Sequence, residues 1–132
     1  MSAAVEGSCH CGAVRWHWAG APESATACNC GLCRRAAALW AYGWEGEAIT
    51  VSGPTRSFLR GDREIEFHHC PTCGGLAYWR AVAVQPDGRR RMAVNLRMAE
   101  PEAVADLPVR HVDMLRGEVP GYVKGRVADL WF

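Results

Sequence analysis

Seven cysteines dominate the chemistry available to this chain of 132 residues. They fall into three groups, which are Cys9-His10-Cys11, Cys28-Asn29-Cys30-Gly31-Leu32-Cys33 and Cys70-Pro71-Thr72-Cys73-Gly74. An odd number of cysteines cannot be used up in pairs, which argues against a disulfide framework. In a reducing compartment, clustered thiols are typical of metal sites, and thiolates at these spacings suit a tetrahedral Zn²⁺. The three groups therefore predict bound zinc.

Each spacing brings sulfur atoms together for a geometric reason. In an extended segment, residues i and i+2 point to the same face, so Cys9 and Cys11 can reach one ion, as can Cys28 and Cys30. A C-x-x-C turn curls so that both of its sulfurs converge. A glycine directly after such a turn, here Gly74, can adopt a positive φ and let backbone N–H groups approach the sulfurs.

The spacing leaves two ways of sharing the cysteines open. One joins the two C-x-x-C pairs into a four-cysteine zinc ribbon (Cys30, Cys33, Cys70 and Cys73). The other forms one site of four cysteines (Cys9, Cys11, Cys70 and Cys73) and a triad (Cys28, Cys30 and Cys33), which strands no cysteine. Four protein ligands close a structural site, whereas three leave one position open for water or substrate. The triad zinc would instead be structural if a carboxylate or a histidine, such as His10 or His69, were its fourth ligand.

Taken in order, the three cysteine groups resemble the glutathione-dependent formaldehyde-activating enzyme family, which also includes centromere protein V. The resemblance rests on residues 7–15, 28–34 and 70–74, and on Val94-Asn95-Leu96, which looks like a short motif that follows in that family. It implies a β-rich, tent-like fold with two zinc ions. It also implies that the site of four cysteines is structural and that the triad holds the reactive zinc, through which Cys28, Cys30 and Cys33 take part in catalysis.

The resemblance implies carbon–sulfur lyase chemistry, in which glutathione adds to formaldehyde and gives S-hydroxymethylglutathione. Three thiolates leave the triad zinc with a net negative charge, yet such a site can still hold an incoming thiol as the nucleophilic thiolate. We therefore predict a zinc-dependent enzyme that adds a glutathione-like thiol to formaldehyde or another small carbonyl. The alternative function is a non-catalytic zinc-binding module for protein or nucleic-acid interaction.

Other side chains are candidates for the thiol site. Arg34 and Arg35 follow the triad and would offset its charge or bind a glutathione carboxylate, unless they form a solvated face. Asn95 would stabilise an oxyanion or make a structural hydrogen bond. His111 and Asp113 have the spacing of an acid–base pair on one strand face. Four aromatic side chains would line a pocket or fill the core, namely Trp40, Trp44, Tyr78 and Trp79.

The elements that must position these groups are predicted to be short and mainly β. Alternating apolar residues predict strands at 14–18 and 48–52. Turn residues predict one hairpin around Gly61-Asp62, over residues 57–68, and another around Pro86-Asp87-Gly88, over residues 76–96. One short helix is predicted near 101–107, because Pro101 suits the first helical position. Residues 34–42 carry conflicting helix and strand signals, and residues 116–132 carry no prediction.

Length and composition fit a single domain spanning residues 1–132. The 15 basic and 14 acidic residues leave a net charge of +1, which argues against a nucleic-acid or membrane-surface partner. Residues 1–7 lack a secretory pattern and no apolar run approaches about 18 residues, so we expect a cytoplasmic protein. The partners expected are a small thiol and a small aldehyde, and the sequence does not determine the oligomeric state.

Overall fold

The computed structural model describes residues 4–116 and 121–130, and within them the chain is mainly β. Residues 1–7 were considered above for a secretory pattern, and residues 1–3 of this segment lie outside the described residues. The two α-helices are α1 (Gly31–Ala36) and α2 (Pro101–Val104), and the two 3-10 helices are η1 (Leu96–Met98) and η2 (Val127–Leu130). The strands are β1 (Val5–Ser8), β2 (Arg15–Trp18), β3 (Ala25–Cys28), β4 (Leu39–Trp44), β5 (Ile49–Ser52), β6 (Arg56–Leu59), β7 (Ile65–His69), β8 (Leu76–Ala81), β9 (Arg91–Asn95), β10 (Pro108–Val112) and β11 (Tyr122–Arg126).

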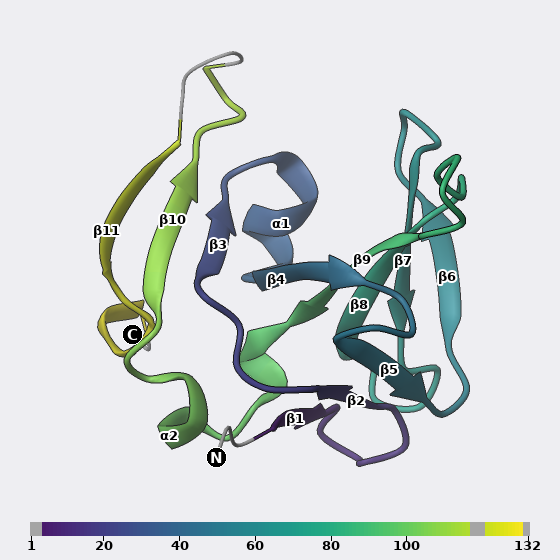
Figure 1. The fold of residues 1–132 in the computed structure, drawn as a ribbon, viewed down its shortest axis with the longest axis horizontal. Coiled ribbons are helices and arrows are strands. Elements are labelled where there is room, and N and C mark those ends of the chain that lie inside the picture. Colours follow the sequence, from purple (N-terminus) through teal and green to yellow (C-terminus); the bar gives the residue numbers. More distant parts are fainter. Residues whose placement is uncertain (1–3, 117–120, 131–132) are drawn as a thin grey trace.

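The strands form two sheets, as Figure 1 shows. The smaller sheet has the order β1-β2-β5, and the larger has the order β11-β10-β3-β4-β9-β8-β7-β6. Strands β10 and β3 pair in parallel, whereas the other pairs in the described strands are antiparallel. The parallel pairing sets the C-terminal end of β10 beside Cys28, the last residue of β3.

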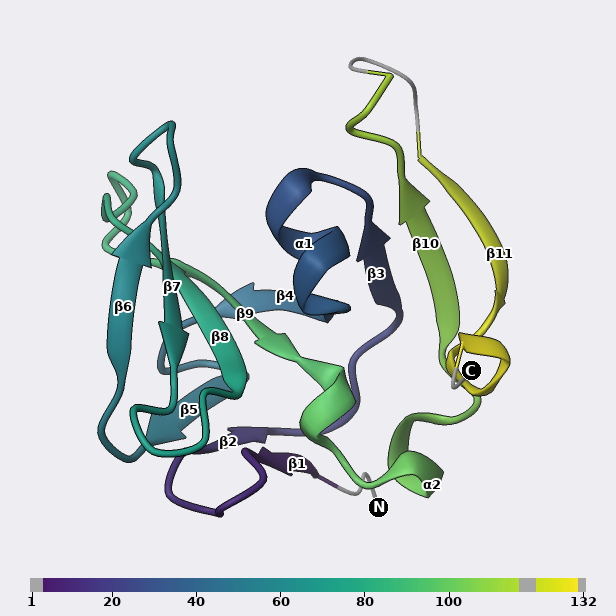
Figure 2. The same cartoon turned by 180° about the vertical axis from the view of Figure 1, so that it is seen from behind.

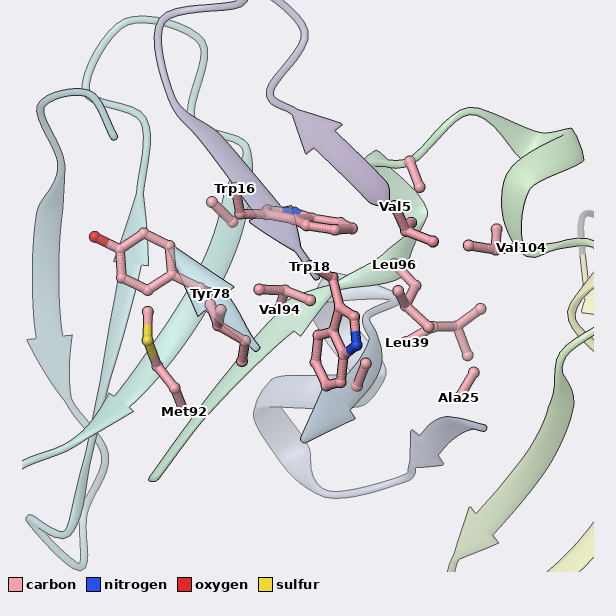
Figure 3. Close-up of a cluster of buried hydrophobic side chains, with 14 of the residues drawn as sticks. Val5, Trp16, Trp18, Ala25, Leu39, Tyr78, Met92, Val94, Leu96 and Val104 are labelled. Atoms are coloured by element: carbon pink, nitrogen blue, oxygen red, sulfur yellow. The ribbon is translucent and has the colours of Figure 1, made fainter. Parts of the chain in front are cut away.

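The main core fills the space between the two sheets (Figure 3). Trp16 and Trp18 project from β2 toward Val94 of β9, and all three side chains are buried. A second cluster lies on the opposite face of the larger sheet, because successive residues of a strand point to opposite faces. Trp40 and Ala93 belong to this second cluster, whereas their neighbours in β4 and β9 belong to the main core. Helix α1 lies beside β4 (Figure 2), and Cys33 of α1 belongs to the second cluster.

The predicted mainly β fold is confirmed, with one correction. Both hairpins occur, as β6–β7 and β8–β9, and the predicted strands occur as β2 and β5. The expected helix is α2, which begins at Pro101 but ends at Val104. The prediction of a single helix is wrong, because the triad turn itself forms α1 before the chain enters β4. Residues 122–130, which carried no prediction, form β11 and η2.

The backbone at Gly7 lies directly against an indole ring. Gly7 of β1 is the register partner of Trp16, and a Cβ at position 7 would lie 2.3 Å from Trp16 Cε2. We expect Gly7→Ala to lower the free energy of unfolding by about 1–3 kcal/mol, because the buried indole must shift to make room. Chemical denaturation measures this change. Gly61→Ala is the matched control, since nothing lies within 4 Å of a Cβ there, and equal stability of the two variants would contradict the expectation.

None of the helices in the described part of the chain is both long enough and apolar enough to cross a membrane.

Candidate metal centres

The first cysteine cluster joins the two sheets. Its sulfur atoms, which all lie within 4.8 Å of one another, belong to Cys9, Cys11, Cys70 and Cys73. Cys9 and Cys11 lie in the loop between β1 and β2 of the smaller sheet, and Cys70 and Cys73 lie in the turn between β7 and β8 of the larger sheet. A metal ion bound here would therefore link the two sheets through four side chains.

The sulfur spacing of this cluster fits a metal site. Cys9 Sγ lies 3.7 Å from Cys11 Sγ, and Cys11 Sγ lies 3.6 Å from Cys70 Sγ. Zn–S bonds of about 2.3 Å in a tetrahedron place the sulfurs about 3.8 Å apart. A disulfide would require an S–S distance of about 2.05 Å. The distances thus match four thiolates around one zinc ion and not a pair of disulfides.

Backbone N–H groups are aimed at the sulfurs of this first cluster. Cys70 Sγ accepts hydrogen bonds from the N–H groups of Thr72 (3.3 Å) and Cys73 (3.4 Å), and Cys9 Sγ accepts one from Val14 (3.3 Å). Backbone donors from Cys11 and Gly75 lower the pKa of Cys73 to about 6. Donors of this kind favour thiolate, which is the form that binds metal. Gly74 takes the positive φ expected of it, at 79°.

The second cysteine cluster is the triad, and it forms where β3 leads into α1. Cys28 ends β3, Cys30 is the N-cap of α1, and Cys33 lies within the helix. Their sulfurs lie within 4.8 Å of one another, and no histidine or carboxylate joins this group among residues 4–116 and 121–130. The described residues therefore supply three ligands, which leaves one position of a tetrahedral ion open.

Hydrogen bonds also hold the triad sulfurs in place. Cys28 Sγ accepts from the N–H of Cys30 (3.5 Å), and Cys30 Sγ accepts from the N–H of Cys33 (3.4 Å). The buried indole of Trp40 donates to Cys33 Sγ at 3.2 Å. Burial raises the pKa of Cys33 to about 12 and also raises the pKa of Cys28. Burial acts in the same direction on Cys30, but hydrogen bonds from the N–H and the side chain of Cys33 bring its pKa below the ordinary value.

One hydrogen-bond network around the triad has no signal in the local sequence. The side chain of Asn29, between Cys28 and Cys30, donates to Asp113 Oδ1 at 2.9 Å. Asn29 Oδ1 accepts from the N–H groups of Met114 (2.7 Å) and Leu115 (3.2 Å). The asparagine thus ties the triad turn to the segment after β10, some 84 residues away in sequence. No local spacing signals this contact, because it depends on the parallel pairing of β10 with β3.

We expect Asn29→Ala to weaken zinc binding at the triad by about 10- to 100-fold, because groups that orient metal ligands typically have effects of this size. Zinc competition with a chromophoric chelator measures the change. The affinity of the four-cysteine cluster should stay unchanged.

Arg116→Ala is the matched control for Asn29→Ala. Arg116 pairs with Asp113 at 3.0 Å, but its side chain is 75% exposed, and exposed ion pairs contribute little. Equal losses of triad zinc affinity in Asn29→Ala and Arg116→Ala would contradict a positioning role for the amide.

The arginine and asparagine candidates differ in exposure and in their hydrogen bonds. Arg34 and Arg35 are exposed on α1, and Arg35 donates to Gly31 O at 3.0 Å. Asn95 is buried, accepts from the N–H groups of Leu39 and Arg97, and donates to Leu76 O, so both amide atoms are engaged in the fold.

The histidine and aromatic candidates lie in different parts of the fold. His111 bonds to Lys124 O while Asp113 bonds to Asn29, so they do not pair with each other. Trp40 and Trp79 pack beneath the triad, in the hydrophobic cluster that also contains Cys33. Tyr78 packs in the main core. The guanidinium carbon of Arg89 lies over the ring of Trp44, 3.8 Å from the ring centre.

Two hollows border the triad. One, of about 160 Å³, is lined by Cys28 itself together with Asn29, His111 and Asp113. The other, of about 630 Å³, lies between α1 and the β6–β7 hairpin, and its wall includes Gly31 and Leu32. The second hollow is large enough for an organic ligand.

Comparison with known proteins agrees with the cysteine motifs. A family model described as glutathione-dependent formaldehyde-activating enzyme matches residues 4–105, which confirms the predicted resemblance. The crystal structure of a Rhodobacter sphaeroides protein is similar at 23% sequence identity and a TM-score of 0.58, over 79% of this chain and 98% of that chain. At this identity the likeness shows the fold alone. No curated protein matches the chain.

Proposed function

Because this chain belongs to the glutathione-dependent formaldehyde-activating enzyme family, we propose that it is a zinc-dependent carbon–sulfur lyase that adds a thiol to formaldehyde or another small carbonyl. The thiol is glutathione or a similar molecule. In the forward direction a C–S bond forms, the C=O π bond opens, and the thiol proton passes to the carbonyl oxygen. The reverse direction breaks the C–S bond and restores both partners. The reaction is balanced without an oxidant or reductant.

One observation carries this proposal: the triad presents three convergent sulfurs without a fourth ligand from the described residues, beside an open hollow. Zinc bound at the triad would supply an open position that holds an incoming thiol as thiolate. The residues of the chain shape that position. The N–H groups of Cys30 and Cys33 and the indole of Trp40 hold the three sulfurs convergent. Arg34 and Arg35, at the surface of α1, are proposed to meet a carboxylate of the thiol substrate.

We propose zinc at both clusters, with the four-cysteine cluster as the structural site and the triad as the reactive one. All seven cysteines must stay reduced to serve as ligands, which suits the cytoplasm.

Exchange spectroscopy tests the reaction directly. Isotope-labelled formaldehyde and glutathione interconvert slowly with their adduct, and nuclear magnetic resonance reports the exchange rate. The zinc-loaded protein is expected to raise this rate, and the variant Cys28→Ala/Cys30→Ala/Cys33→Ala is expected to leave it at the uncatalysed value. If the protein does not accelerate exchange for glutathione or for any other small thiol, the enzyme proposal fails and a non-catalytic zinc module becomes the better account.

A further inference from the structure

Tyr42 of β4 lies on the same face of the larger sheet as the triad. Thr26 and Cys28 share one face of β3, because alternate residues of a strand point the same way. Thr26 is the register partner of Trp40 in β4, so Trp40 lies on this face too. The indole of Trp40 reaches the triad directly and donates to Cys33 Sγ at 3.2 Å. Tyr42 is the next side chain of β4 on this face, two residues beyond Trp40.

The ring of Tyr42 is held by packing and is still open to solvent. It contacts the ring of Trp79, with centroids 5.8 Å apart, and Trp79 is buried in the hydrophobic cluster that contains Cys33. Ala93 lies between Tyr42 and Trp79 in the sheet, and its small side chain lets the two rings meet. Tyr42 itself is 49% exposed. A side chain that packing locks in place beside a metal-binding cluster is well positioned to meet a substrate.

The phenol of Tyr42 is available as a hydrogen-bond donor. Partial burial and the charge of Cys28 raise the pKa of Tyr42 above its ordinary value, and the charge of Cys33 acts in the same direction. A hydrogen bond from Thr26 acts against them and leaves the phenolic hydrogen free. Since the ordinary pKa of tyrosine is already about 10, Tyr42 keeps its proton at neutral pH. The influence of two triad sulfurs also places the phenol within range of their charge.

The proposed reaction needs such a donor. When a sulfur adds to a carbonyl, negative charge develops on the carbonyl oxygen, and a hydrogen-bond donor at that oxygen lowers the barrier. Both amide atoms of Asn95 are engaged in the fold, and the indole of Trp40 is engaged by Cys33. The carbonyl oxygen is two bonds farther out than the substrate sulfur. A donor for it must therefore lie beside the triad and not within it, as Tyr42 does.

From this arrangement we infer that Tyr42 is a catalytic residue of the triad site, and that its phenol donates a proton to the oxygen of the small carbonyl as the C–S bond forms. The inference rests on the proposed function and adds the group that handles the proton. The electron pair of the C=O π bond moves to the oxygen, which takes the phenolic proton. The proton lost by the thiol returns to the phenolate through water. Breakdown of the adduct uses the same groups in the reverse order.

Exchange spectroscopy of Tyr42→Phe tests the inference, because this variant keeps the ring that packs on Trp79 and loses only the hydroxyl. The exchange rate that the protein adds to the uncatalysed value should fall by about 100-fold. Glutathione binding to the cobalt-substituted variant, followed by cobalt absorption, should stay unchanged, because the phenol contacts the carbonyl oxygen and not the thiol. Tyr42→His restores an N–H donor on a ring and should regain part of the lost rate.

Tyr78→Phe is the matched control, because it removes the same hydroxyl from the main core, on the opposite face of the sheet. It should leave the exchange rate unchanged. The inference is overturned, and the proposed function kept, by an unchanged rate in Tyr42→Phe or by an equal loss in Tyr78→Phe. A loss of glutathione binding in Tyr42→Phe, or a Tyr42→His protein slower than Tyr42→Phe, would assign Tyr42 a packing role and also overturn the inference. If the unmodified protein does not accelerate exchange, the proposed function and the inference fail together.

Discussion

Replacing Cys70 with alanine is expected to unfold the protein. Its sulfur is buried, lies 3.6 Å from Cys11 Sγ, and accepts two backbone hydrogen bonds. A structural four-thiolate zinc contributes on the order of 10 kcal/mol to folding in zinc-finger peptides. This is comparable to the whole stability of a typical domain, about 5–15 kcal/mol. Because the ion would be bound by both the β1–β2 loop and the β7–β8 turn, its loss should separate the two sheets. Circular dichroism and thermal denaturation of Cys70→Ala measure the effect.

Addition of a strong chelator to the unmodified protein provides the independent check. Removing the metal should produce the same loss of structure as Cys70→Ala, and adding zinc back should reverse it in the unmodified protein alone. A Cys70→Ala protein that kept a cooperative transition near that of the unmodified protein would show that the packed core holds the sheets together without the metal.

Replacing the three triad cysteines should remove zinc and catalysis but leave the protein folded, unlike Cys70→Ala. The variant Cys28→Ala/Cys30→Ala/Cys33→Ala is expected to stay folded and to lose one of two bound zinc ions and all catalysis of adduct exchange. It should stay folded because Cys28 and Cys30 are only partly buried, and because alanine suits position 33, the one triad position inside α1. Elemental analysis of purified protein gives the zinc content, and thermal denaturation shows whether the fold persists.

The four-cysteine ribbon makes a different prediction for the same variant. If Cys30 and Cys33 shared one ion with Cys70 and Cys73, the unmodified protein would hold a single zinc, and the triad variant would lose it and unfold. In the structure, Cys30 and Cys33 belong to a different cluster from Cys70 and Cys73. The stoichiometry therefore decides between the two arrangements in solution.

The sequence by itself determined which residues can bind metal and much of the local structure around them. Cys70-Pro71-Thr72-Cys73-Gly74 is a turn whose shape depends on neighbours in sequence, and Gly74 adopts the positive φ that the motif requires. The β6–β7 and β8–β9 hairpins were likewise predictable, because turn residues and alternating side chains act over a few residues. The family resemblance, carried by the same cysteine motifs, was also available from sequence.

Only the tertiary structure decided which cysteines come together, because the spacing alone allowed two partitions. Packing of the β1–β2 loop of the smaller sheet against the β7–β8 turn of the larger sheet sets Cys70 beside Cys11, and this contact does not follow from spacing. The same is true of the Asn29–Asp113 bond, which needs the parallel pairing of β10 with β3. The hollow of about 630 Å³ brings Leu32 and Phe58 together from distant elements. Contacts between residues far apart in sequence arise from packing, which no local pattern encodes.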